Sequence, residues 1–144
     1  MQVNPYIVLG GNCAEALEFY EKAFNGKVTM ISRYKDAPAQ EGYVTPPEFA
    51  EFILHAQIDI GGAIIMFCDN SPHLPYNVGN HVMLSVAYDC DDAAKAAFAG
   101  LKEGGTVLME LQETFWSKCF GMVKDKYGFV WQITLVGQEH VTHK

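Results

Sequence analysis

The sequence predicts an α+β protein made of two copies of a βαβββ module. Short apolar runs, some with strict alternation, indicate strands, and one stretch in each half has the apolar spacing of an amphipathic helix. The same order recurs in residues 1–68 and in residues 81–136. We therefore expect a single domain over residues 1–144 with these two internal modules.

The first module starts with a β-branched run, Val3 to Leu9, that leads into a glycine pair. A helix is predicted next, because apolar residues recur at helical spacing and Asn12 with Glu15 forms a capping-box pattern. Gly26 is expected to end this helix. Further strands are predicted at 27–34, 51–60 and 63–68, with a proline-bearing loop at 35–47.

The strand predicted at 51–60 separates two kinds of side chain. Its apolar residues fall on one face: Leu54, Ala56, Ile58 and Ile60. Its polar residues fall on the other: His55, Gln57 and Asp59. Such alternation indicates one buried face, so the polar face points into a cavity or into water. The next run, 63–68, is apolar throughout, which predicts burial on both faces.

The second module repeats the order of the first. A strand is predicted from His81 to Tyr88, followed by a helix at 89–103 with Asp89 and Asp92 as its capping pattern. A glycine pair at 104–105 is expected to end the helix. The remaining strands are predicted at 106–112, 120–124 and 129–136.

The two modules also match in residues. The helix starts align, Asn12-Cys13-Ala14-Glu15-Ala16 with Asp89-Cys90-Asp91-Asp92-Ala93, and so do the glycines that follow the helices, Gly26 and Gly105. Chance likeness of two capped amphipathic helices is the alternative to a duplicated module, since unrelated helices share such signals. We favour the duplication.

Composition excludes several classes of partner. A net charge of −7 and a pI near 5.1 argue against a nucleic-acid partner, because phosphate binding requires clustered Lys and Arg. No apolar run approaches the roughly 20 residues that span a bilayer, so no membrane segment is expected. The four cysteines have no CxxC or zinc-ribbon spacing, and the start of the chain has no signal-peptide pattern, which favours a cytoplasmic location.

Three stretches resemble a known family: PYIVLGGNCAEALEFYEKAF, HAQIDIGGAIIMFCDNSP and QETFWSKCFGMVKDKYGFVWQI. They are similar to the vicinal oxygen chelate superfamily, which includes glyoxalase I, extradiol dioxygenases and bleomycin-resistance proteins, and within it to the PhnB-like branch. The resemblance implies two βαβββ modules that form an incomplete barrel with the helices outside and a ligand cavity inside. It also implies a homodimer, with the cavity built either within one subunit or across two.

The resemblance further implies four positions for the ligands of a divalent ion. In the second module these positions correspond to His81 and Gln132, and in the first to Asn4 or Pro5 and to Met66. A thioether and a proline are poor donors for a hard cation, so we expect no metal at this site. A rearranged site is the alternative; it combines His81 and His55 with a carboxylate, Asp59 or Glu110.

Two functions follow from these expectations. The first is a protein that binds or sequesters a small molecule, without metal or another cofactor, in a cavity lined by His55, Gln57, His81, Trp116 and Gln132. The second is a metal-dependent lyase, isomerase or dioxygenase of glyoxalase type that uses the rearranged site. The sequence identifies no catalytic residue and no particular ligand.

Overall fold

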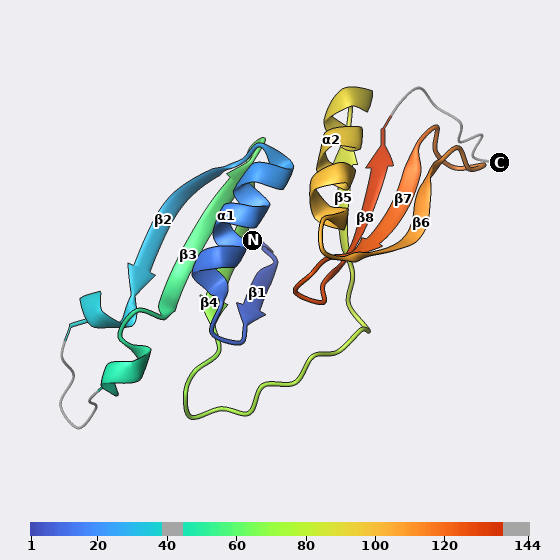
Figure 1. The fold of residues 1–144 in the computed structure, drawn as a ribbon. Coiled ribbons are helices and arrows are strands. Elements are labelled where there is room, and N and C mark those ends of the chain that lie inside the picture. Colours follow the sequence, from blue (N-terminus) through green and yellow to red (C-terminus); the bar gives the residue numbers. More distant parts are fainter. Residues whose placement is uncertain (39–44, 137–144) are drawn as a thin grey trace. The chain divides into compact units, whose positions relative to one another are not determined.

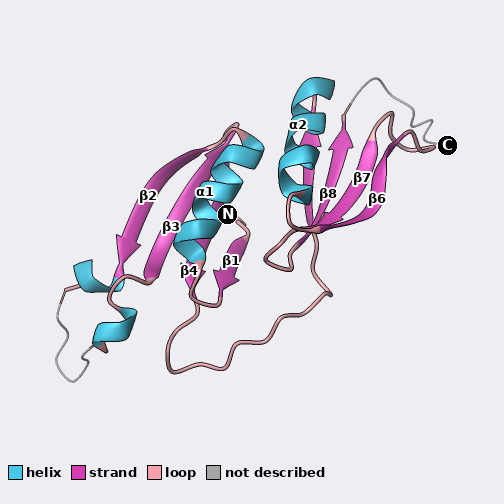
Figure 2. Cartoon of the chain, viewed as in Figure 1, coloured by secondary structure: helices cyan, strands magenta, loops and turns pink. Residues whose placement is uncertain are grey.

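A computed structural model describes residues 1–38 and 45–136 of the chain. The chain divides into two compact units, Met1–Asn77 and Val78–Lys144. Each unit contains one α-helix and one four-stranded mixed sheet (Figures 1 and 2). Both units have the element order βαβββ, which confirms the α+β class and the repeated module.

In the first unit the strand order in the sheet is β1-β4-β3-β2, and only β1 and β4 are parallel. Two short 3₁₀ turns, at 34–36 and 47–49, lie at the two ends of the predicted loop, whose middle, 39–44, is outside the described residues. The regular elements are β1 (Tyr6–Leu9), α1 (Cys13–Phe24), β2 (Lys27–Arg33), β3 (Ile53–Ile60) and β4 (Ala63–Asp69).

The second unit has the same topology, with strand order β5-β8-β7-β6 and the parallel pair β5 and β8. Its first strand begins three residues later than predicted, so His81 lies on the segment before the sheet. The regular elements are β5 (Leu84–Tyr88), α2 (Asp91–Lys102), β6 (Thr106–Gln112), β7 (Phe120–Lys124) and β8 (Val130–Leu135).

Each unit has its own hydrophobic core between its helix and one face of its sheet. The buried face of α1 consists of the residues whose spacing predicted the helix: Cys13, Ala16, Leu17, Tyr20, Ala23 and Phe24. Tyr20 stacks on Phe67 of β4 with ring centroids 5.5 Å apart. In the second unit Phe98 and Leu101 of α2 are buried, as are Trp131 and Ile133 of β8. We call the opposite side of each sheet its helix-free face.

The start of α1 is anchored differently from the prediction. Asn12 is the N-cap residue, but its side chain makes no capping hydrogen bond. Instead, Oδ1 of the buried Asp69 accepts hydrogen bonds from the backbone N–H groups of Gly11 and Cys13, at 3.0 and 2.9 Å. The other oxygen, Oδ2, accepts from the N–H of Ile53 at 2.8 Å. A carboxylate at a helix N-terminus is also favoured by the helix dipole.

The third strand contains a bulge that the alternation did not reveal. Ser32 pairs with His55 while the next residue, Arg33, pairs with Ile53, so Leu54 is an extra residue. Ile53 therefore takes the buried position, and Leu54 is 37% exposed rather than buried. The prediction for β4 was also wrong, because only every second residue of this strand is buried. Its apolar run covers one buried and one half-buried face.

Two glycines support the duplication in three dimensions. A Cβ on Gly26 would lie 2.9 Å from the backbone oxygen of Asp59, near the end of β3. A Cβ on Gly105 would collide with the backbone oxygen of Lys124, at the end of β7. Both glycines therefore allow the chain after the helix to approach the third strand closely. The left-handed residue that ends α1 is Asn25, with φ of 49°, and not Gly26 as predicted.

Among the described residues no helix is long and apolar enough to cross a membrane.

Candidate functional site

The helix-free face of the first sheet presents polar and thioether side chains. Gln57 alternates with the buried Ala56 and Ile58, so its side chain points away from α1. Its Cα partners are Met66 on β4 and Met30 on β2, and Met66 in turn pairs with Tyr6 on β1. Residues paired in this way lie side by side on the same face. His55, two residues before Gln57, lies on this face as well.

Three of these side chains form a hydrogen-bonded cluster. Tyr6 Oη lies 2.8 Å from His55 Nδ1, and Gln57 Nε2 lies 3.1 Å from His55 Nε2. An amide nitrogen can only donate, so His55 Nε2 accepts from Gln57 in this arrangement. In the neutral imidazole Nδ1 then carries the proton and donates to Tyr6 Oη. The cluster therefore fixes one tautomer of His55.

The phenol of Tyr6 and two nearby thiols stay protonated at neutral pH. Burial, followed by the neighbouring Cys68, raises the pKa of Tyr6 to about 12. Burial also raises the pKa of the Cys68 thiol, although the hydrogen bond from Tyr6 opposes this. The pKa of Cys13 is raised as well, first by burial and then by Asp69. A thiol is nucleophilic as the thiolate, so these cysteines are not activated nucleophiles.

The helix-free face of the second sheet is richer in sulfur. Gln132 on β8 alternates with the buried Trp131 and Ile133. Its Cα partner on β7 is Met122, which pairs with Met109 on β6. On its other side, Gln132 Nε2 donates a hydrogen bond to the sulfur of Met83 at 4.0 Å. An amide between thioethers is thus at the centre of this face.

Trp116 covers one end of the same face. Its ring meets that of Phe120 edge-on, with centroids 5.3 Å apart, and that of Phe115 at 4.6 Å. The loop that carries Trp116 is held by the buried Ser117, whose Oγ accepts a hydrogen bond from Thr134 Oγ1 at 3.0 Å. Trp116 remains 47% exposed. It therefore has free ring surface for a ligand or for another protein.

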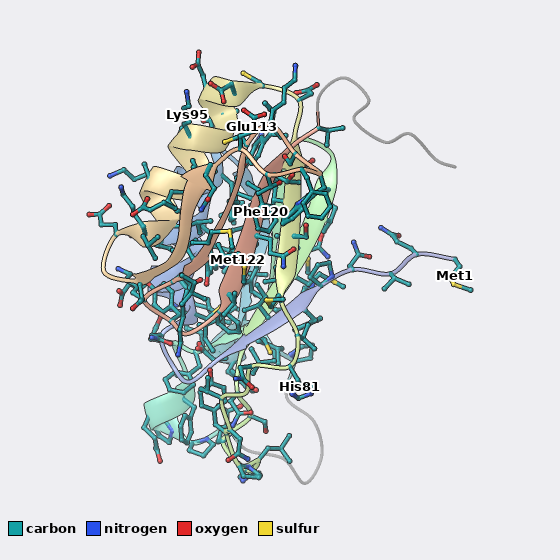
Figure 3. All side chains as sticks on the ribbon, turned by 90° about the vertical axis from the view of Figure 1, so that its right-hand side faces the viewer. Met1, His81, Lys95, Glu113, Phe120 and Met122 are labelled. Carbon is teal, nitrogen blue, oxygen red and sulfur yellow. The ribbon has the colours of Figure 1, made fainter. Side chains whose placement is uncertain are left out.

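The five residues predicted to bind a ligand fall into three places. His55 and Gln57 lie together in the cluster on the first sheet, and Gln132 and Trp116 lie on the helix-free face of the second. His81 is exposed and precedes β5, beyond the end of the sheet and away from Met122 (Figure 3). The structure does not bring it next to Gln132.

The strand register shows that Met83, and not His81, occupies the position that the family uses for a metal ligand. Tyr6 pairs with Met66 in the first unit, and Ser85 pairs with Gln132 in the second. Two residues earlier, just before each first strand, lie Asn4 and Met83, which are therefore equivalent. The sulfur contact between Met83 and Gln132 agrees with this assignment. His81 corresponds instead to Gln2.

The four positions do not fit a hard divalent cation. They hold two thioethers, which are soft donors, and two neutral amides, with no carboxylate or imidazole among them. The Nδ2 of Asn4 donates to the Ile64 carbonyl oxygen at 3.0 Å, which ties this side chain to β4. Asp59, a carboxylate of the rearranged site, accepts from the Gly62 N–H at 2.7 Å. Within residues 1–38 and 45–136 no cluster of three or more His, Cys, Asp or Glu residues is placed to hold a metal ion.

Sequence reasoning missed Tyr6 and Met83 as residues of the helix-free faces. For Tyr6 a signal was present, because Ile7 and Leu9 are the buried residues of β1 and a period of two turns Tyr6 to the opposite face. For Met83 the available signal was its distance from the helix that follows, which is close to the distance between Asn4 and the first helix. His81, two residues before Met83, was assigned to the ligand position instead because histidine is the better metal donor.

Comparisons with known proteins agree with this architecture. The model of the Glyoxalase/Bleomycin resistance protein/Dioxygenase superfamily matches residues 2–133. The chain is 29% identical to Protein YjdN of Escherichia coli K12, over 96% of this chain and 98% of that protein.

Two solved structures are also similar. Protein PA1353 from Pseudomonas aeruginosa is 32% identical, with a TM-score of 0.83 over 94% of this chain and 97% of the other. The PhnB protein from Bacillus cereus is 27% identical, with a TM-score of 0.74 over 94% and 100%. The chain therefore belongs to the glyoxalase/bleomycin resistance protein/dioxygenase superfamily, with PhnB-like proteins among its relatives.

Proposed function

We propose that the protein binds a small organic molecule on its helix-free faces and does not use a divalent ion at the family's four positions. One observation carries this proposal: the Tyr6, His55 and Gln57 side chains bond to one another and not to the backbone. Buried Asp69 and Asp125, by contrast, hold backbone N–H groups in place. Polar groups that support no backbone are available for recognition.

The chemistry of the cluster favours binding over covalent catalysis. A phenol, an imidazole and an amide offer donors and acceptors without an activated thiol, because burial raises the pKa of Cys68. Thioethers of Met30 and Met66 border the cluster and supply apolar contact. This combination of a few polar groups in an apolar surround is typical of small-molecule sites.

Methionine methyl groups provide a direct test of binding. The protein is labelled with ¹³C-methyl methionine and titrated with a defined set of neutral, cationic and anionic aromatic fragments. We expect some of these fragments to shift the signals of Met30 and Met66, and His55→Ala to weaken that response. Lys95→Ala, on the outer side of α2, is the matched control and should leave it unchanged. If none of the fragments shifts these signals, the proposal fails.

Metal analysis tests the second part of the proposal. Protein purified without chelator is analysed for bound metal and then titrated with Mn²⁺, Ni²⁺, Fe²⁺ and Zn²⁺ by calorimetry. We expect no stoichiometric binding. Stoichiometric metal that is lost in both His55→Ala and His81→Ala would overturn the metal-free proposal in favour of the rearranged site. The homodimer and the cytoplasmic location stay predictions, of which sedimentation of the purified protein tests the first.

A further inference from the structure

The methionines of this protein are not spread at random. The chain has six, and all except Met1 lie on the helix-free faces of the two sheets. Buried cores usually prefer Leu, Ile and Val, whereas unbranched, polarisable methionine adapts to partners of different shape. The cores beneath the helices contain no methionine among the buried residues of the described chain. The two faces therefore share a property that core packing does not require.

Both faces place one glutamine between two methionines. Gln57 has Met30 on one side and Met66 on the other. Gln132 has Met122 on one side and the sulfur of Met83 on the other. The two arrangements are not copies, because Met66 and Gln132 occupy equivalent places on the fourth strand of each sheet. The same chemistry has thus been built twice from different positions.

The spacing of this arrangement matches one aromatic ring. Neighbouring strands are about 4.8 Å apart, so the two methionines that flank a glutamine start about 10 Å apart. Sulfur contacts an aromatic ring favourably at about 5 Å, often at the ring edge. One planar ring standing over the glutamine therefore meets both thioethers at their preferred distance.

The glutamine then faces the edge of that ring. Neither side-chain carbonyl oxygen, of Gln57 or of Gln132, accepts a hydrogen bond from the described residues, and Nε2 of Gln57 keeps one N–H beyond its bond to His55. An amide with a free acceptor and a free donor pairs with a ligand edge that carries the complementary donor and acceptor. Such an edge occurs on an amide or a lactam.

Charge narrows the ligand further. The strand positions level with the two glutamines hold no charged residue; they are Tyr6, Met66, Gln57 and Met30 in one sheet and Ser85, Gln132, Met122 and Met109 in the other. Arg33, at the end of β2, and Lys35, in the turn that follows, are paired with Glu51. The lysines of these strands, Lys27 opposite Asp59 and Lys124 at the end of β7, lie further along. A carboxylate or phosphonate level with the glutamines would therefore lose its hydration without a cation beside it.

Resting on the proposed function, we propose that each helix-free face takes a neutral, planar aromatic group with an amide-type donor and acceptor edge. The ring lies between the two thioethers and the edge pairs with Gln57 or Gln132. Benzamide is the simplest probe of this class. Benzoate replaces its amide by an anion, cyclohexanecarboxamide removes the aromatic ring, and methylphosphonate is an anion without a ring.

The test uses the full chain labelled with ¹³C-methyl methionine. We expect benzamide to produce saturable ring-current shifts at Met30, Met66, Met83 and Met122, while Met1 serves as the internal control and does not move. Benzoate and cyclohexanecarboxamide should bind at least about tenfold more weakly, because each loses one of the two contacts. Gln57→Leu should weaken benzamide about tenfold at the first face only, and Gln132→Leu at the second only, so each variant controls the other.

The failures of the two proposals are distinguishable. Tighter binding of benzoate or methylphosphonate than of benzamide overturns the ligand class and leaves small-molecule binding intact. Unchanged benzamide affinity in both leucine variants also overturns the class, because the edge contact is then absent. Binding by none of the fragments contradicts the proposed function itself. Unshifted methyl signals of the unaltered face in each variant show that the variant is folded.

Discussion

The two units have the same topology but anchor it with different residues. In the first, Asp69 at the end of β4 joins the start of α1 to the start of β3 through three backbone N–H groups. The equivalent residue in the second is Leu135, since Tyr88 pairs with Leu135 as Leu9 pairs with Asp69. The second unit uses Asp125 instead, which binds Tyr127 N, Phe129 N and Trp131 Nε1. A duplicated backbone has thus acquired a long-range anchor in one copy and a local one in the other.

The helix-free faces differ in the same manner. The first contains a phenol and an imidazole joined by a hydrogen bond of 2.8 Å. The second has Ser85 in the register position of Tyr6 and presents thioethers and the aromatic rings of Trp116 and Phe120. Only the glutamine between methionines is common to both. The ligand class proposed for both faces therefore rests on this shared glutamine, and the other residues distinguish the two faces.

The largest expected effect is a difference in stability between variants of the two anchoring aspartates, Asp69 and Asp125. Asp69→Ala leaves three backbone donors from distant segments without their acceptor, and we expect it to lower the free energy of unfolding by about 4 kcal/mol. Asp125→Ala affects three donors that all lie within six residues of it, including the Trp131 indole N–H, and should cost about 2 kcal/mol. Urea unfolding of both variants measures the difference. Asp91→Ala, an exposed member of an ion pair with Lys95, is the control and should cost below about 0.5 kcal/mol. Equal losses at Asp69 and Asp125 would refute the distinction.

A second comparison concerns the two glycines that follow the helices. Ala at position 105 forces its Cβ against the backbone of β7, and we expect Gly105→Ala to cost about 3 kcal/mol. Gly26→Ala meets the Asp59 oxygen at 2.9 Å and should cost about 1.5 kcal/mol. Thermal unfolding ranks the two variants. Gly79→Ala is the control, because its Cβ meets only His81 at an ordinary 3.6 Å. A reversed ranking would contradict the tighter approach at Gly105.

Much of the fold was predictable because periodicity reports local burial. The helix spacing identified the whole buried face of α1, and the strands at 106–112 and 120–124 have the predicted bounds. What failed was decided by distant residues. Asn12 looked like a cap, but Asp69, 57 residues along the chain, takes that role through a contact that no local pattern encodes. The bulge at Leu54 depends on pairing with β2, which the alternation of a single strand does not contain.

The candidate site was predictable only in part for the same reason. His55 and Gln57 share a face because they are two residues apart on one strand, which sequence shows directly. That Tyr6 reaches His55 requires the parallel pairing of β1 with β4. That Met83 rather than His81 lies beside Gln132 requires the register of β5 against β8. Sequence shows which residues of one strand share a face, and the register between strands decides which residues of neighbouring strands lie side by side.

A third prediction uses the titration of Tyr6, which has no counterpart in the second unit because Ser85 takes its place. Burial raises its pKa to about 12 from an ordinary value of 10, so the folded state holds the proton more tightly than the unfolded state. The resulting stabilisation is fully present below pH 10 and is lost as the pH rises toward 12. The stability difference between wild type and Tyr6→Phe should therefore stay constant up to pH 10 and shrink above it. Thermal unfolding across this range measures the difference, and a constant difference up to pH 11 would contradict the shift.

The smallest expected effect has the opposite sign and lies in the second unit. The hydroxyl of Tyr88 on β5 is buried and has no hydrogen-bond partner among the described residues, and burial raises its pKa. Its equivalent in the first unit is Leu9, a buried aliphatic residue.

An unpaired buried hydroxyl costs free energy that its removal recovers, so we expect Tyr88→Phe to stabilise the protein by about 0.5–1 kcal/mol. Tyr6→Phe at neutral pH should destabilise it instead, because that hydroxyl is bonded to His55. Urea unfolding of the two single variants shows whether the signs differ. A loss of stability in Tyr88→Phe would mean that its hydroxyl has a partner, such as a buried water, and that both units use their first-strand tyrosine for hydrogen bonding.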